Sequence, residues 1–376
     1  MNPPIRHRRD LLDDIITLTA AFERPVTLME VCGTHTMAIA RSGLKRLLPD
    51  RLRLVSGPGC PVCVTPVEII DYACRLAAEP DVVICSFGDM VRVPGSRSSL
   101  ERYRPRIVYS CRDALEIASR NPQRQIVFFA VGFETTAPGI AATILEASRR
   151  SIKNFYILSA LKMIPPALEQ LARTPRLNID GFILPGHVSA IIGEAPYHFL
   201  AQNHGIPSCI TGFQPVEILR GIRNLLQQIR SRRPYVGNEY SWIARPGGNA
   251  RAREIMKRVF APTGGNWRGL GTIDNSSLAL RHSYRHFDIT LSYSYPIRPG
   301  RTPRGCRCAQ VLLGVSEPAD CPLFARECTP ATPIGPCMVS SEGACAAHYA
   351  YGDRDRRTPP RNHRSTARTQ RPRSDS

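Results

Sequence analysis

Short apolar runs alternate along the chain with longer segments in which apolar residues recur at helical spacing. The apolar runs end in Gly, Pro or Ser, as strands buried on both faces do, and an amphipathic pattern follows most of them. Strands that alternate with helices predict parallel sheets with helices packed on their faces. The predicted strands span residues 26–31, 52–56, 82–86, 126–131, 155–160, 181–184 and 206–210, and the predicted helices span 36–48, 66–78, 137–149, a segment from 165, and 215 to about 230.

The two successive sets of strands and helices predict an α/β fold with two Rossmann-like domains with parallel sheets, at residues 25–150 and 151–235. Further on the chain becomes polar and turn-rich, a helix is expected over 249–259, and a stretch rich in Arg, Pro and Gly follows. Residues 236–352 are therefore a predicted third, loop-rich domain, which we expect to depend on a metal for folding. This domain is also a candidate packing site for residues 1–24.

Composition places the chain among globular proteins of more than one domain. It has 376 residues, 43% of them hydrophobic, which is sufficient for a sizeable core. No apolar run reaches the roughly 18 residues of a membrane span, and the N-terminal stretch lacks the apolar core of a secretory signal. We therefore expect a cytoplasmic protein with no membrane span.

The formal net charge is +19, and a balance this basic suggests an anionic partner. The charge is uneven, because residues 353–376 carry eight arginines against three aspartates, with prolines and no large apolar residue. This composition predicts a disordered basic tail. The sequence has no basic patch interleaved with aromatic residues of the kind that reads single-stranded nucleic acid, so we expect no nucleic-acid partner.

The chain has 13 cysteines, and six of them fall within residues 306–345. In a reducing cytosol, thiols this dense are more often metal ligands or redox groups than a disulfide framework. Their spacing differs from the compact run of bacterial ferredoxins and lacks the paired knuckles of a zinc ribbon. A [4Fe–4S] cluster would take four thiols and leave a dithiol beside it, while a zinc site stays open as an alternative. The six are Cys306, Cys308, Cys321, Cys328, Cys337 and Cys345.

A second group of thiols follows two predicted strands near the start of the chain. Cys32 ends one apolar strand, and Cys60 and Cys63 form a C-P-V-C pair after another. Because open parallel sheets bind ligands at the carboxyl ends of their strands, both sites are expected to face one crevice. A C-x-x-C pair at a helix start is expected to have at least one thiol of lowered pKa, and thiolates are soft ligands for iron, copper or zinc. The alternative for Cys32 is a buried core residue.

Two histidines accompany these thiols. His35 lies two residues after Gly33, beside Cys32, and His187 follows Gly186 at the end of another predicted strand. Both are candidates to shape a metal pocket, and His187 is also a candidate proton donor. A hydrogen-bonded structural histidine is an equally open interpretation.

Together these segments resemble the HypD family of hydrogenase maturation factors, from about residue 26 to residue 351. No single segment is generic, so the resemblance is specific. It implies a protein that forms a complex with the small chaperone HypC and holds the iron that becomes the Fe(CN)2CO unit of [NiFe]-hydrogenases. The carbamoyl-derived cyanide would arrive through HypE. The segments are MEVCGTH (29–35), SGPGCPVCVTP (56–66), FGDMVRVPG (87–95), GFETTAP (132–138), FILPGH (182–187), WRGLG (267–271) and GPCMVSSEGAC (335–345).

The resemblance also implies residue roles. The family's iron-site cysteine matches Cys32, and its redox pair matches Cys60 and Cys63, which are also candidate additional thiols of the iron site. Fe(II) carrying cyanide and carbon monoxide is then a bound cargo, and the chain is an assembly scaffold more than an enzyme. The family's [4Fe–4S] cluster, in a setting similar to ferredoxin–thioredoxin reductase, matches Cys306, Cys321, Cys328 and Cys345, which leaves Cys308 and Cys337 as an extra redox thiol pair.

Two other functions remain open from the residues themselves. A stand-alone iron–sulfur thiol–disulfide oxidoreductase would use the C-P-V-C pair on protein substrates, and it would bind no iron beyond its cluster. A zinc-dependent nucleic-acid binder, suggested by the net charge, would be colourless and would bind DNA in a salt-dependent way.

Overall fold

The apolar runs of the sequence form two parallel sheets in the computed structural model, which describes residues 8–174 and 177–352. The predicted α/β class with two parallel sheets is confirmed. The predicted basic tail, residues 353–376, lies outside the described residues. Among the described residues, no helix combines the length and the apolar character that crossing a bilayer requires.

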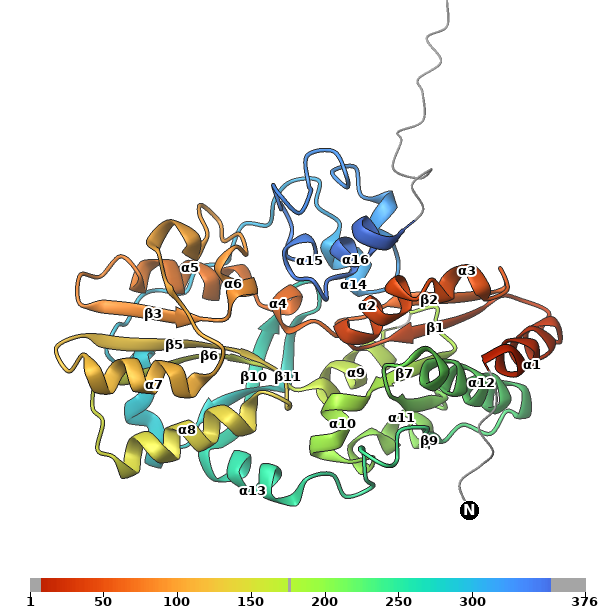
Figure 1. Ribbon diagram of the computed structural model, residues 1–376, viewed down its shortest axis with the longest axis horizontal. Coiled ribbons are helices and arrows are strands. Elements are labelled where there is room, and N and C mark those ends of the chain that lie inside the picture. The colour runs from red at the N-terminus through yellow and green to blue at the C-terminus, as the bar shows by residue number, and fades with distance from the viewer. Residues whose placement is uncertain (1–7, 175–176, 353–376) are drawn as a thin grey trace, which may run out of the picture.

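The first sheet has five parallel strands in the order β2-β1-β7-β8-β9. Helices α1 (Arg8–Ala20) and α12 (Pro215–Ser231) pack together on one face of it, where Leu11 and Ile15 join Ile218 and Ile222 in a core with Leu28. Both helices lie beside this sheet in Figure 1. The strands are β1 (Val26–Glu30), β2 (Leu52–Ser56), β7 (Gly181–Pro185), β8 (Ser208–Thr211) and β9 (Val236–Asn238).

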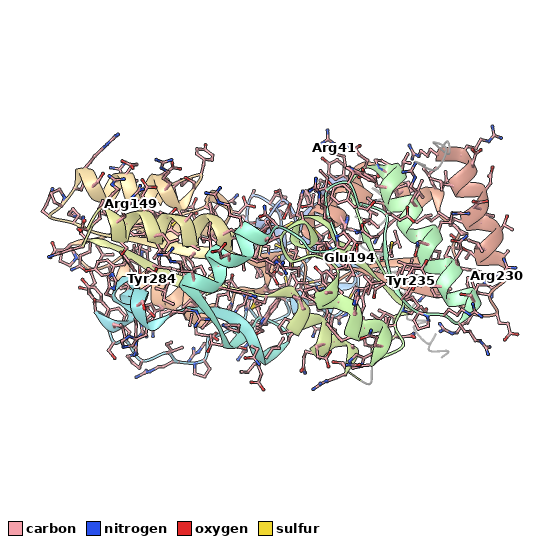
Figure 2. The ribbon with its side chains drawn as sticks, turned by 90° about the horizontal axis from the view of Figure 1, so that it is seen from below. Arg41, Arg149, Glu194, Arg230, Tyr235 and Tyr284 are labelled. Carbon is pink, nitrogen blue, oxygen red and sulfur yellow. The ribbon has the colours of Figure 1, made fainter. Side chains whose placement is uncertain are left out.

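The second sheet has four parallel strands in the order β4-β3-β5-β6. Successive side chains of its strand β5 point into two different cores. Phe128 packs in the core with α7 and α8, whereas Phe129 packs in the core at the centre of the molecule. Helix α13 (Ala250–Val259) lies against α8, whose end carries Arg149 (Figure 2). The elements are β3 (Val82–Ser86), β4 (Arg106–Ile107), β5 (Gln125–Gly132), β6 (Phe155–Leu161), α7 (Cys111–Arg120) and α8 (Ala137–Arg149).

The strand pairing does not follow the domain boundary predicted near residue 150. Strand β6 pairs with β5 across that boundary. Strand β1 pairs with β7, so β1 and β2 lie in one sheet with β7, β8 and β9. The chain therefore crosses between the sheets twice, after β2 and again after β6 (Figure 1). Local periodicity carries no information on which distant strand will pair, and the boundaries 25–150 and 151–235 were wrong for that reason. Residues 8–20 also pack on the five-stranded sheet and not on the cysteine-rich region.

Two elements differ locally from the prediction. The helix expected over 36–48 is split into α2 (Gly33–Arg41) and α3 (Leu44–Leu47), because Gly43 adopts a left-handed conformation with φ +66°. The region expected to be loop-rich contains an antiparallel hairpin, β10 (Phe260–Trp267) and β11 (Gly271–Leu280), with a bulge between Thr263 and Gly265. Glycines and a proline in β10 hide its strand pattern.

The cysteine-rich segment from about residue 306 to residue 352 sits above the junction of the two sheets, over α2 and α4 (Figure 1). Its short helices are α14 (Cys308–Leu312), α15 (Pro336–Val339) and α16 (Ala344–Tyr351). The remaining helices are α4 (Pro61–Val64), α5 (Val67–Leu76), α6 (Gly88–Val91), α9 (Ile164–Ala172), α10 (Gly186–Ile192) and α11 (His198–Gln202), with 3₁₀ turns at Leu100–Tyr103, Ala195–Tyr197, His282–Phe287, Ile289–Leu291 and Pro318–Asp320.

Candidate functional site

The candidate site lies at the carboxyl edge of the five-stranded sheet. Because β1, β2, β7 and β8 run parallel, the loops after all four strands meet at this edge. Cys32 follows β1, Cys60 lies in the loop after β2, and His187 lies in the first turn of α10, directly after β7. The topology therefore brings these three residues to one edge of the sheet.

Two of these loops touch through a glycine. The backbone N–H of Gly33 donates a hydrogen bond to the carbonyl of Gly59, over 2.9 Å. A Cβ at position 59 would lie 2.1 Å from the backbone nitrogen of Cys32, so no larger residue fits there. The Gly-Pro-Gly that precedes the C-P-V-C pair therefore sets how closely that pair approaches Cys32.

Cys32 caps the start of α2 and is buried, which raises the pKa of its thiol to about 12. Glu342, from the cysteine-rich segment, reaches the same loop, where the hydroxyl of Thr34 donates to its Oε1 over 2.7 Å. The Glu342 carboxylate interacts electrostatically with both Cys32 and His187. A thiol, a carboxyl group and an imidazole, one from each of three segments, thus lie close enough to influence one another.

His35 holds α2 to the end of β8. Its Nε2 donates to the carbonyl of Gly212 over 2.9 Å and lies 2.8 Å from Thr211 Oγ1, which places the proton on Nε2. The ring is fully buried, and burial lowers the pKa of His35 to about 4. His35 is therefore neutral, and its Nδ1 has no hydrogen-bond partner among the described residues.

His187 is more exposed than His35. Its ring stacks on Phe213 with centroids 4.0 Å apart, and Phe213 also contacts the His35 ring at 4.7 Å. Partial burial lowers the pKa of His187. The two histidines named from the sequence therefore line one aromatic wall, which continues through Tyr240 to the exposed Trp242.

The C-P-V-C pair forms the start of α4. Cys60 caps this helix through a hydrogen bond from the Cys63 N–H to its sulfur, with Pro61 in the first turn. The Cys63 thiol donates to the Cys60 sulfur over 2.6 Å, and both cysteines are free thiols in the structure. Burial raises the pKa of Cys63 well above its ordinary value. For Cys63 this is opposite to the lowered pKa predicted from a helix start, because α4 has only four residues and lies in the core.

The C-terminal thiols meet one another and also meet this pair. Helix α15 packs on α4, which brings the thiol of Cys337 beside that of Cys63. Cys337 also interacts with Cys308 and Cys345. The contacts with Cys308 and Cys63, together with burial, raise the pKa of Cys337, and the contact with Cys345 opposes this shift. A continuous line of sulfurs therefore runs from Cys60 through Cys63 and Cys337 to Cys308.

The other thiols surround the end of this line. Cys306 hydrogen-bonds Cys308, Cys328 interacts electrostatically with both, and the Cys321 thiol donates to the carbonyl of Gly305 over 3.7 Å. Gly335 completes the cradle, because a Cβ there would lie 2.5 Å from the Cys308 sulfur and 2.7 Å from that of Cys306. The thiols have the density and softness that an iron–sulfur cluster needs.

Among the residues that the structure describes, no three His, Cys, Asp or Glu side chains converge as ligands of one ion. Cluster thiolates each bind a different iron and therefore lie further apart than the ligands of one zinc ion. The donor set is compatible with the [4Fe–4S] interpretation of the six-thiol block.

A model of the HypD family, described as "Hydrogenase formation hypA family", matches residues 7–352. The chain belongs to the HypD family. It is 44% identical over 343 residues to "Hydrogenase maturation factor HypD2" of Bradyrhizobium diazoefficiens, covering 88% of this chain and 90% of the relative. It is 44% identical over 337 residues to HypD of Cupriavidus necator (86% and 89%) and 42% identical over 341 residues to HypD of Escherichia coli (89% and 91%).

Three charged residues of this HypD-family site were not predicted from the sequence. Glu342 and Glu30 approach Cys32, and Arg268 approaches the sulfur line. Burial raises the pKa of Glu30 to about 7, and its Oε1 accepts from the hydroxyl of Thr36 over 2.6 Å. All three lie inside segments that carry the family resemblance, and a charged residue in an otherwise apolar or glycine-rich segment was the available signal.

Proposed function

We propose that this chain is a scaffold for [NiFe]-hydrogenase maturation that, in a complex with HypC, holds iron while its Fe(CN)2CO unit is assembled. The printed names of the relatives support the maturation role. The observation that carries the proposal is the joining of Cys32, the C-P-V-C pair and the C-terminal thiols at one edge of one sheet. HypC is the proposed stable partner, HypE the transient source of cyanide, and the cytoplasm the proposed location.

Cys32 is the proposed iron ligand of this chain. Its sulfur sits at the start of α2, where the backbone N–H groups of Thr34 and His35 stabilise a thiolate. Burial opposes ionisation, so the thiol should lose its proton when iron binds. His35 acts as a positioning residue that fixes α2, and His187 and Glu342 complete the wall of the pocket.

Cys306, Cys321, Cys328 and Cys345 are the proposed ligands of a [4Fe–4S] cluster. When bound, such a cluster would supply electrons one at a time to the neighbouring thiols. The contacts of Cys308 with Cys337 support their assignment as a separate redox pair. Iron, cyanide and carbon monoxide are the cargo. The proposed role of the chain's own thiols is to keep the site that binds this cargo reduced.

Thiol–disulfide exchange can pass along the sulfur line without any other group. Cys337 would attack the sulfur of Cys63, break the Cys60–Cys63 bond and release Cys60, which takes up a proton. Cys308 would then attack Cys337, form the Cys308–Cys337 disulfide and release Cys63 as a thiol. Two electrons and two protons thereby move from one pair to the other, which supports a role for both pairs in keeping the iron site reduced.

The test is an infrared spectrum of the full chain purified anaerobically with HypC. Cys32→Ser should fold, keep its cluster and still bind HypC, yet show no cyanide or carbon monoxide bands, because serine offers a harder and poorly ionised oxygen. Cys74→Ser, which changes a buried thiol outside this edge, should keep the bands. Wild-type bands in Cys32→Ser would place the iron on other residues, and absent bands in the wild-type complex would remove the proposed function.

A further inference from the structure

Arg268 is a buried arginine at the turn between β10 and β11, with 6% of its surface exposed. Two hydrogen bonds anchor it to the end of α4: its backbone N–H donates to the carbonyl of Val64, and its Nε donates to the carbonyl of Thr65, each over 2.9 Å. These carbonyls directly follow Cys63 in the chain. The Nη2 group of Arg268 has no hydrogen-bond partner among the described residues.

A buried guanidinium is costly unless an anion compensates it, because arginine stays protonated in proteins. No carboxylate forms an ion pair with Arg268 among the residues that the structure describes. The groups that interact with it electrostatically are sulfurs, in the order Cys308, Cys337, Cys63 and Cys306. The anionic partner of this cation therefore has to come from the sulfur group.

The turn is also fixed on the opposite side. Gly269 adopts φ +89°, and a Cβ there would come within 3.0 Å of the Cα of Ala309, the residue after Cys308. The turn thus lies directly on the start of α14 while it is hydrogen-bonded to the end of α4. Arg268 is held between the helix that carries Cys63 and the helix that begins with Cys308.

We propose that Arg268 is the counter-cation of the sulfur group formed by Cys63, Cys306, Cys308 and Cys337. A fixed positive charge stabilises whichever state of nearby sulfurs carries more negative charge, and donors to sulfur tune redox sites in the same sense. A disulfide is uncharged, whereas a reduced pair can hold a thiolate, so Arg268 favours the reduced pair by stabilising that thiolate. This inference rests on the redox role proposed above for these thiols, and it assigns Arg268 as a positioning residue for that role.

The test measures how readily the Cys60–Cys63 disulfide is reduced in the anaerobic full-length chain. In dithiothreitol buffers, the protein disulfide breaks as the reagent's own disulfide forms, and two electrons pass to the protein. Alkylation followed by peptide mass spectrometry locates each thiol. Arg268→Gln should lower the reduction equilibrium constant at least about tenfold, equivalent to about 30 mV. Arg268→Lys, which keeps the charge, should lie closer to wild type.

Arg307→Gln is the matched control, because Arg307 is exposed and lies between Cys306 and Cys308 in the sequence. The variant removes one positive charge, and its Cys60–Cys63 disulfide should be reduced as readily as that of the wild type. An Arg268→Gln equilibrium constant within a factor of two of wild type would overturn the inference. So would an Arg268→Lys variant as impaired as Arg268→Gln, because that result would assign the effect to side-chain shape.

A double-mutant cycle between Arg268→Gln and Cys308→Ser separates this inference from the proposed function. If the thermal unfolding midpoints of the four proteins show a non-additive shift, the guanidinium and the sulfur are coupled whether or not the thiols carry electrons. Additive shifts would overturn the coupling. A wild-type chain that forms no Cys60–Cys63 disulfide in any buffer would remove the proposed redox relay, and the cycle would still decide the role of Arg268.

Discussion

Cys85, Cys111 and Cys209 lie among aliphatic and aromatic side chains in the cores of the two sheets, whereas Cys63, Cys308, Cys337 and Cys345 contact one another. All seven are buried, so exposure does not separate the two groups. The number of neighbouring thiols does, since each of the four lies beside several other sulfurs, whereas Cys85 and Cys111 lie near each other in a hydrocarbon core. At the scale of residues, chemistry in this protein follows from which buried groups are placed side by side.

Glu134 is a buried carboxyl whose titration should affect stability. Its Oε1 accepts from the Ile164 N–H over 3.0 Å, its Oε2 has no partner among the described residues, and burial raises its pKa from 4.5 to about 7. Because the folded state holds this proton more tightly, its stabilising effect is complete below pH 4.5 and is lost as the pH rises to about 7. The loss amounts to at most about 3 kcal/mol.

Glu134→Gln should remove that pH dependence, because the amide keeps an oxygen for the Ile164 N–H and does not titrate. Urea unfolding from pH 5 to pH 8 should show the wild type falling in stability relative to the variant as the pH rises. Glu254→Gln changes an exposed carboxyl and should track the wild type. Parallel curves for Glu134→Gln and wild type would show that the carboxyl is not buried in the way described.

At the scale of elements, close backbone contacts fix how the loops of the site are stacked. Gly59→Ala would place a methyl group 2.1 Å from the Cys32 nitrogen, so the two loops must separate. The variant should lose about 2 kcal/mol or more of unfolding free energy and should alter the alkylation rates of Cys32 and Cys60 together. Gly139→Ala, inside α8 with no atom within 4 Å of the added Cβ, should instead gain about 0.5–1 kcal/mol. Unchanged stability and thiol reactivity in Gly59→Ala would contradict the described contact.

The hairpin β10–β11 is secured by one of the two tryptophans of the chain. Trp267 is buried, stacks on Phe133 and donates from Nε1 to Ser276 Oγ over 2.8 Å, whereas Trp242 is 54% exposed. Trp267→Ala should cost about 3–5 kcal/mol of unfolding free energy in denaturant titrations. Trp242→Ala should change it by less than about 0.5 kcal/mol. If both substitutions changed the unfolding free energy equally, Trp267 would not stabilise the hairpin in the way described.

At the scale of the whole molecule, one core joins the two sheets and the cysteine-rich segment. Phe129 and Leu184 of the two sheets share this core with Cys321, Cys328 and Cys345. The segment itself has only short helices, so we expect its order to depend on the proposed cluster. Iron content and local order should therefore be lost together.

Cys345→Ala should release iron and make residues 306–352 sensitive to trypsin while both sheets stay resistant, as judged by metal analysis and mass spectrometry of the fragments. Cys209→Ala removes an equally buried thiol from β8 and should keep both the iron and the protection, at a modest cost in stability. Iron retained in Cys345→Ala would exclude that residue as a ligand. Iron lost to the same extent in both variants would indicate that any core defect disorders the segment.

The pattern of residues along the chain was sufficient to predict the parallel α/β class, most strand positions, and the grouping of thiols into a front set and a C-terminal set. Period and spacing are local properties, so buried strands and dense cysteines are visible before any fold is known. Specific segments such as GPGCPVC were sufficient for the family, because the chemistry of a thiol loop requires those residues in that order.

Only the tertiary structure decided that β1 pairs with β7, that α1 packs on α12, and that Cys337 meets Cys63. These contacts join residues more than 100 positions apart, and their energy comes from packing that no local pattern records. The same holds for Arg268 and Glu342, whose neighbours come from other segments of the chain. Burial likewise reversed the pKa shift that a helix start predicts for Cys63, because desolvation of a buried thiolate outweighs the dipole of a four-residue helix.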